Sequence, residues 1–196
     1  MHLTDTDLDD SDQRDTDFTD AVYEDCTFRS ADLSRVTTTR ATFTRCDFTG
    51  ADMVASRHLG SAFRNCTFER TLLWDTVFEG CSLLGTTVRD SRVRPVTLRD
   101  CDLTLAGLGG LDLRKAVLAG SRLREANVVD ADLREADLTG CDLAGARTVG
   151  LKLGGADLRG ARIDAATWVA ASVRGARIDP AQAFDYAVAH GLVLAD

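Results

Sequence analysis

From residue 131 to residue 140 the chain reads ADLREADLTG, which is one five-residue pattern written twice. Taken at every fifth residue from Leu3 to Ile178, all but four of 36 positions carry Leu, Ile, Val, Met, Phe, Tyr or Trp. The exceptions are Gln13, Thr38, His58 and Thr148. Two residues before each of these positions lies a second register, in which 31 of 36 residues are Ala, Cys, Ser or Thr. The sequence is therefore a repeat of five-residue units.

A period of five excludes a simple helix or strand, because neither keeps every fifth residue on one side. Units that turn a corner after each five residues do place the large and the small residue inside. Four such units close a square coil of about twenty residues. No unit can bury its apolar residue alone, so the coils have to stack on one another.

The units at 131–135, 136–140 and 156–160 resemble the A(D/N)LXX signature of the pentapeptide-repeat family. The resemblance implies an all-β fold, a right-handed quadrilateral β-helix, with about nine coils over residues 1–178. The first 25 residues hold ten acids and one base, a composition typical of disordered tails. Because this segment stays in the five-residue register, we expect it to be folded coil.

The pattern changes after Ile178, so we expect residues 179–196 to form a separate C-terminal element. Asp179 and Pro180 are typical of a helix N-cap and first helical residue, and Gly191 is typical of a helix end. A helix of about ten residues is not stable alone. We expect it to cap the last coil and to join two chains in a homodimer; capping alone is the alternative. The predicted interface residues are Phe184, Val188, Leu192 and Leu194.

The cysteines and histidines favour structural roles. The six cysteines lie 20, 20, 15, 20 and 40 residues apart with no CxxC motif, so we expect buried free thiols rather than disulfides or a zinc site. His58 takes an inward position and should be a hydrogen-bonded core residue. Pro95 interrupts the repeat, where a kink or a cis bond is expected.

No pattern in the sequence indicates an enzyme. There is no nucleophile elbow, phosphate-binding glycine loop or HExxH-type motif, so we expect no catalytic residue, no metal and no cofactor. The N-terminus has no basic or apolar signal region and no apolar run is long enough to span a membrane, which favours a cytoplasmic protein without a membrane partner. A pI near 4.9 argues against direct nucleic-acid binding.

Several stretches off the repeat consensus resemble the members of the family that protect DNA gyrase from fluoroquinolones. They are GSAFRNCTFER at 60–70, LW at 73–74, RPVTL at 94–98, LAGART at 143–148 and AHGL at 189–192. The resemblance implies a dimeric, DNA-mimicking rod that binds DNA gyrase, inhibits or modulates it, and protects it from the drug. The alternative is a scaffold that binds another cytosolic protein.

If the protein mimics DNA, the mimicry has to depend on where its charges lie and not on its total charge. Nine coils spaced about 4.8 Å apart make a rod of roughly 43 Å, and duplex DNA of that length carries about 25 phosphates. The chain has a net charge of only −8, and its four faces sum to −2, −3, +1 and −2. The outward acids that we expect to face gyrase are Asp90, Asp100, Glu125, Asp130 and Glu135. Trp74 projects outward by register and is a candidate partner contact.

Overall fold

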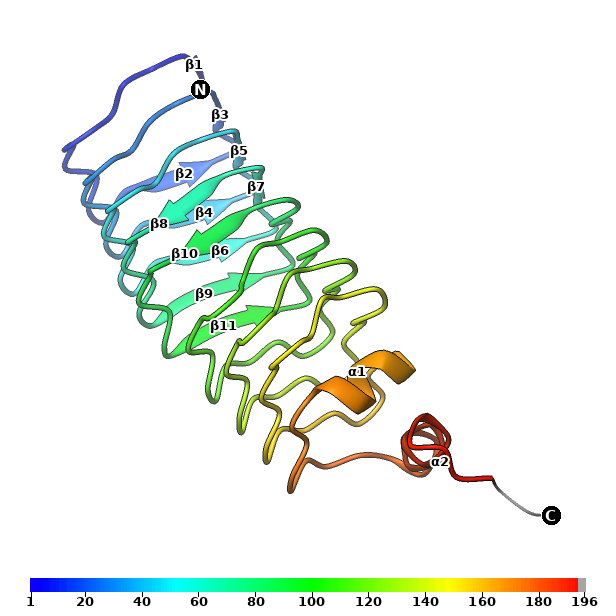
Figure 1. Cartoon of the computed structure of the whole chain (residues 1–196). Helices are drawn as coiled ribbons and strands as arrows, with labels where there is room; N and C mark the ends of the chain where they lie inside the picture. Colours follow the sequence, from blue (N-terminus) through cyan, green and yellow to red (C-terminus); the bar gives the residue numbers. More distant parts are fainter. Residues whose placement is uncertain (194–196) are drawn as a thin grey trace.

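The computed structural model, which describes residues 1–193, is a long solenoid of parallel β-strands with two helices at its C-terminal end (Figure 1). Each strand pairs with a segment twenty residues away, so that His2 lies opposite Val22 and Val22 opposite Thr42. The last such pair joins Asp157 to Arg177. Twenty residues thus complete one coil of four units, which confirms the predicted quadrilateral β-helix.

We number the four faces by the units of the first coil. Face 1 continues residues 1–5, face 2 residues 6–10, face 3 residues 11–15 and face 4 residues 16–20, each at steps of twenty. Face 1 carries the sheet β1-β3-β5-β7, face 2 the pair β8-β10, and face 4 the sheet β2-β4-β6-β9-β11. On face 3, the backbone pairing among the described residues consists of isolated β-bridges.

Within the described residues, all regular strands lie in the first half of the chain, which also holds the inward Phe and Tyr residues of the repeat and many outward Thr, residue types that favour extended backbone. The strands are β1 (His2–Thr4), β2 (Asp17–Thr19), β3 (Val22–Glu24), β4 (Thr37–Thr39), β5 (Thr42–Thr44), β6 (Arg57–Leu59), β7 (Ala62–Arg64), β8 (Thr67–Glu69), β9 (Thr76–Glu79), β10 (Thr87–Arg89) and β11 (Val96–Arg99). The acidic first segment begins with β1 and is folded coil, as predicted.

The core is a stack of side chains that repeat every coil. The rings of Phe28, Phe48 and Phe68 lie face to face along the axis, with centroids 5.0 and 4.8 Å apart. A second column of rings begins at Tyr23, and Leu replaces the aromatic residues in later coils. The six cysteines are buried and free, as predicted.

The last residue of almost every unit has a positive φ, which lets the chain turn the corner. Gly110 has φ of 71° and Asp90 has φ of 53° there. Gly and Asp adopt this left-handed conformation more readily than most residues, which explains why they recur at this position. Pro95 occupies the same position, and the Arg94–Pro95 bond is cis.

The sequence register continues to Ile178, but the backbone does not remain β throughout. Residues Ala165–Ala170 form helix α1, where the sequence predicted another unit of the solenoid. Two alanines begin this segment, and Ala has the highest helix propensity. Trp168 keeps the inward position of the repeat, but Ala166, the other inward position, is exposed and Thr167 is buried instead, so the burial pattern changes together with the backbone.

Helix α2 (Pro180–Ala189) closes the C-terminal end and confirms the predicted helix. Asp179 and Gln182 form a capping box, in which each side chain accepts a hydrogen bond from the other residue's backbone N–H. The Gln182 amide also donates to the carbonyls of Leu158 and Ala161, at 2.6 and 2.7 Å. The helix therefore supplies a partner for the Ala161 carbonyl and a second bond to the Leu158 carbonyl, which already accepts from the Ala161 N–H.

His58 is the buried polar centre of the N-terminal half. Its Nδ1 lies 2.9 Å from the Thr38 hydroxyl and its Nε2 lies 3.0 Å from the Ser56 hydroxyl, which confirms the predicted hydrogen-bonded role. The ring also stacks on Phe78, with centroids 4.5 Å apart. Burial lowers the pKa of His58 to about 3, so the imidazole is neutral in the folded protein at any pH near 7.

We expect His58→Phe to reduce the loss of stability on mild acidification. Between pH 6.5 and about 3 the unfolded chain protonates His58 and the folded chain does not, so stability is lost as pH falls through this window. At pH 5 this amounts to about 2 kcal/mol. In the variant, Phe can stack on Phe78 while Thr38 keeps its bond to Ser61 and Ser56 its bond to the Met53 carbonyl.

The measurement is denaturant unfolding of both proteins at pH 7.5 and pH 5. Carboxylates whose pKa values are lowered in the folded state contribute below about pH 4.5, so they do not obscure the difference. Equal losses of unfolding free energy in the two proteins would contradict the low pKa of His58 in the folded protein.

Candidate partner-binding surface

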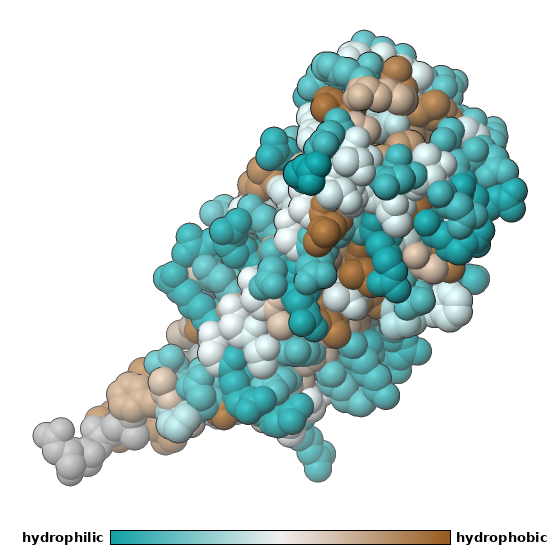
Figure 2. Space-filling view, turned by 180° about the vertical axis from the view of Figure 1, so that it is seen from behind, coloured by the Kyte–Doolittle hydropathy of each residue, from teal (hydrophilic) through white to brown (hydrophobic). Residues whose placement is uncertain are grey.

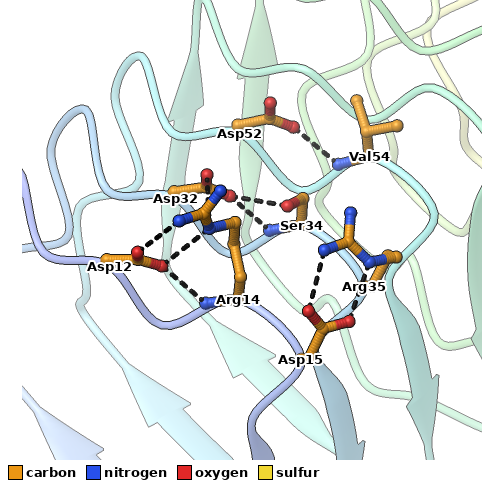
Figure 3. A network of polar contacts seen from close by, with 8 residues as sticks. All are labelled: Asp12, Arg14, Asp15, Asp32, Ser34, Arg35, Asp52 and Val54. Atoms are coloured by element: carbon orange, nitrogen blue, oxygen red, sulfur yellow. Dashed lines mark hydrogen bonds and ion pairs between the residues drawn. The ribbon is translucent and has the colours of Figure 1, made fainter.

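Most of the carboxylates fall into two classes by their place in the unit. The first class lies one residue before the inward centre. Asp132 represents it: its Oδ1 accepts a hydrogen bond from the Arg134 backbone N–H at 3.2 Å, and its Oδ2 lies 2.6 Å from the Arg134 guanidinium. Asp12 and Arg14 repeat this arrangement on the same face (Figure 3). Such a bond fixes the turn that follows.

The same backbone bond recurs along the rod, which gives a physical reason for Asp or Asn in the repeat. The other residues that make it are Asp7, Asp32, Asp47, Asp52, Asp102, Asp112, Asn127, Asp137, Asp142 and Asp157. Hydrogen bonds from the Arg114 side chain lower the pKa of Asp112 to about 2, and those from Arg159 do the same for Asp157. We call this class the turn acids.

The second class lies at the corners, where φ is positive. Three of the corner acids in the first two coils are neutralised across coils: Asp15 pairs with Arg35 at 2.7 Å (Figure 3), Asp20 with Arg40 and Asp25 with Arg45. Hydrogen bonds from these arginines lower the pKa values of the three carboxyls. Together with Asp12, four of the ten acids in residues 1–25 are therefore paired with an arginine.

All five acids that the sequence proposed as partner contacts are exposed corner acids. Asp90 and Asp130 share the corner that ends face 2, two coils apart with Gly110 between them. Glu125 lies at the corner where face 2 begins. Asp100 and Glu135 lie on two other corners. The structure thus gathers Asp90, Glu125 and Asp130 around face 2 and separates the other two from them.

Pairing distinguishes these acids further. Lys115 Nζ lies 3.5 Å from Glu135 Oε2, so this acid is partly neutralised. Within residues 1–193, the other four have no cationic side chain within 4.0 Å. The Asp130 carboxylate lies over Gly150 in the next coil, in the space that a Cβ would occupy, and Asp100 lies over Gly120 in the same way. A corner glycine therefore makes room for each of these two side chains.

The face of the molecule shown in Figure 2 is mostly hydrophilic, with small hydrophobic patches. Trp74 projects from face 3 with 54% of its surface exposed, as predicted. Phe184 and Val188 on α2 and Leu192 just after it are each more than half exposed, and Leu194 lies outside the described residues. Tyr186 instead packs on Trp168, with ring centroids 5.7 Å apart.

The sequence pattern indicated the exposed side of α2 but not the residues that attach the helix to the solenoid. These are Gln182 and Tyr186. The capping-box spacing from Asp179 to Gln182 was the available signal for the first.

No group of three or more metal-binding side chains occurs in the part of the chain that the structure describes. The interior cavity is apolar and measures about 30 Å³, which is too small for a substrate. No helix among residues 1–193 has both the length and the apolar character needed to cross a membrane. The absence of catalysis, of a cofactor and of nucleic-acid binding stays a prediction.

Comparison with known proteins supports the repeat fold. A family profile described as pentapeptide repeats matches residues 24–57, 101–140 and 136–176. The pentapeptide repeat protein MfpA of Mycobacterium tuberculosis is 54% identical over 44 residues, a match that spans 22% of this chain and 24% of that relative. The chain therefore covers about a quarter of the curated relative.

Two solved structures have the same fold. One is HetL from the cyanobacterium Nostoc, a protein involved in the regulation of heterocyst differentiation: the TM-score is 0.78 at 22% identity, over 90% of this chain and 82% of HetL. The other is QnrB1, a plasmid-mediated fluoroquinolone resistance protein: the TM-score is 0.72 at 18% identity, over 100% of this chain and 98% of QnrB1.

We expect Asp132→Ala to lower the free energy of unfolding by about 1–2 kcal/mol, since it removes a side chain–backbone hydrogen bond and an ion pair. Asp132→Asn should cost about half as much, because the amide oxygen still accepts from the Arg134 N–H. The neighbouring corner substitution Asp130→Asn is the control and should change stability by less than about 0.5 kcal/mol. Chemical denaturation of the three variants checks this order. Equal effects at 130 and 132 would contradict the division into two classes.

Proposed function

The chain belongs to the pentapeptide-repeat family, and from this premise we propose that it is a DNA-mimicking protein that binds DNA gyrase, inhibits or modulates it, and protects it from fluoroquinolones. The identity with MfpA and the five stretches off the repeat consensus support this proposal over other roles in the family. The fluoroquinolone resistance of QnrB1, a protein of the same fold, agrees with it.

The observation that carries the proposal is the set of unpaired carboxylates around face 2. This face has the most negative net charge of the four, −3, and three acids of its first coil, Asp7, Asp9 and Asp10, account for that sum. Asp90 and Asp130 are two coils apart, which at about 4.8 Å per coil places their attachment points about 10 Å from each other along the rod. Glu125 lies across the same face. The stacked coils hold these charges in fixed positions, as the double helix holds its phosphates.

Such a surface suits a protein groove that normally accommodates duplex DNA. A DNA-binding groove is lined by Lys and Arg and attracts an extended row of negative charge. Within the described residues, the corner acids Asp90, Glu125 and Asp130 have no cationic side chain within 4.0 Å and are therefore available to it. Association driven by these charges should weaken as ionic strength rises.

The exposed side of α2 supports a homodimer as part of the proposal. Phe184 and Val188 lie side by side on α2 and Leu192 is exposed just after it, at the C-terminal end of the rod; to these we add Leu194 from the sequence. A two-fold axis at this end would place the two rods end to end. The negatively charged surface presented to gyrase would then be twice as long.

The charge proposal is tested by supercoiling with gyrase from Mycobacterium tuberculosis. We expect wild-type protein to inhibit supercoiling and to reduce the double-strand breaks that a fluoroquinolone induces. The triple variant Asp90→Asn/Glu125→Gln/Asp130→Asn should need at least a tenfold higher concentration for half-inhibition.

A control variant removes the same charge away from face 2: Asp75→Asn/Glu79→Gln/Asp100→Asn. It should inhibit within about twofold of wild type. Absence of inhibition by the wild type would overturn the proposal. Equal weakening in both triple variants would show that total charge, and not face 2, is recognised.

The dimer is tested by Val188→Asp. The side chain is half exposed on α2, so the substitution should convert a dimer to a monomer and leave the unfolding temperature of the solenoid within a few degrees. Leu59→Asp is the control, since Leu59 is equally exposed on β6 but far from α2 in the sequence. Light scattering coupled to size exclusion gives the masses. A wild-type monomer, or a dimer that survives Val188→Asp, would refute this interface.

A further inference from the structure

The β-ladder of face 3 is interrupted at one point. Parallel bridges run from Asp52 to Leu72 and from Leu72 to Arg92, and they resume from Asp112 onward. Among the described residues, none joins Arg92 to Asp112. The fourth face, by comparison, is bridged continuously from Asp17 to Arg177.

The interruption leaves backbone donors free. In an intact part of the ladder, Arg92 N–H donates to the Thr71 carbonyl at 3.1 Å and Leu113 N–H donates to the Asp132 carbonyl at 2.9 Å. The equivalent N–H groups at the interruption belong to Asp112 and Val93. Within residues 1–193 neither makes a hydrogen bond.

A groove of about 540 Å³ lies over this interruption. Its apolar side is formed by Val54, Leu72 and Trp74, and its basic side by Arg92 and Arg94. Ser91, Val93 and Asp112 complete the lining. The two free backbone donors therefore belong to residues that line the groove.

The side chains of the groove depart from the pattern that the fold requires. In the next unit of face 3, the turn acid Asp112 holds Arg114 at 2.7 Å. Arg92 replaces the turn acid in the unit at 91–95, so Arg94 has no carboxylate in its own unit. Its nearest one is Asp112, at 3.7 Å. Arg92 has no ion pair within the described residues. The unit at 71–75 has Leu and Trp at the two equivalent positions.

We propose that this groove is a docking site for an acidic segment of a partner protein. The carboxylates of the segment would bind Arg92 and Arg94, and an apolar side chain would pack on Trp74 and Leu72. Arg binds carboxylates with two parallel hydrogen bonds, and the free N–H groups add further donors for them. Trp and Arg are also the residue types that contribute most to binding at protein interfaces. Neither is needed here for the solenoid.

The charges around the groove favour a short peptide over a nucleic acid. Asp52 and Asp75 lie on its N-terminal side, and Asp112 and Asp132 on its C-terminal side. The basic region is therefore about one coil deep along the rod, roughly 5 Å. A phosphate backbone that followed the rod would meet carboxylates in both directions, whereas one or two acidic side chains fit between them. The site does not depend on gyrase as the partner.

The test is selection of binders from a random 12-residue peptide library displayed on phage, with the full-length protein as target. We expect selected peptides to be enriched in Asp and Glu next to Leu, Ile or Phe. Synthetic peptides of the selected sequences should change the fluorescence of the exposed Trp74 on binding, since the other tryptophan, Trp168, is buried. A single-stranded oligo-dT probe should bind at least tenfold more weakly.

Arg92→Asp is the decisive variant, because it restores the turn acid of the repeat and should pair with Arg94 as Asp112 pairs with Arg114. It should fold normally and weaken peptide binding at least tenfold, and Trp74→Ala should weaken it by a similar factor.

The control Lys152→Asp makes the same charge change in the same column of face 3 and should alter binding less than twofold. The inference is overturned by a lack of peptide enrichment, enrichment in Lys and Arg, preference for oligo-dT, or equal weakening by the control. Since no gyrase is present, such a failure leaves the proposed function untouched.

Discussion

Contact between inward side chains twenty residues apart is the interaction on which the rest of this structure depends. Each unit offers one large and one small side chain to the interior, and neither is buried until the coils above and below are in place. The ring columns from Phe28 to Phe68 show this directly, since each ring is covered by the ring of the next coil. The turn acids and the cross-coil ion pairs then fix the corners that bring successive coils into alignment. Stability is consequently a sum of contacts between neighbouring coils, and the two ends need special treatment.

The five-residue period was sufficient to predict the solenoid, the inward positions and the burial of His58, because one repeated contact determines all of them. Helix α1 could not be predicted in this way, since Ala166 and Trp168 fit the sequence register of the repeat, whereas the structure buries Thr167 in place of Ala166. The interruption of the ladder next to Arg92 was also missed, although Pro95 marked the place. Composition pointed to the acids, but only their geometry separates those that hold turns from those that are free.

This separation gives the functional interpretation its physical basis. A turn acid such as Asp132 is occupied by its own backbone and an arginine, so it contributes little to recognition by a partner. Corner acids such as Asp90 and Asp130 make no such bonds and project from a rigid framework. The groove beside Trp74 follows the same logic with the opposite charge, because its arginines lack the carboxylates found in equivalent units. In both cases, residues that the fold does not require are the ones proposed to bind.

The central claim, that the rod takes the place of duplex DNA on gyrase, is tested most directly by competition. A fluorescently labelled duplex bound to gyrase is titrated with the protein at several duplex concentrations and at two ionic strengths. The account predicts complete displacement, with a midpoint that rises in proportion to the duplex concentration and an affinity that falls steeply with salt. Formation of a ternary complex of gyrase, duplex and protein, or a midpoint independent of the duplex concentration, would contradict it.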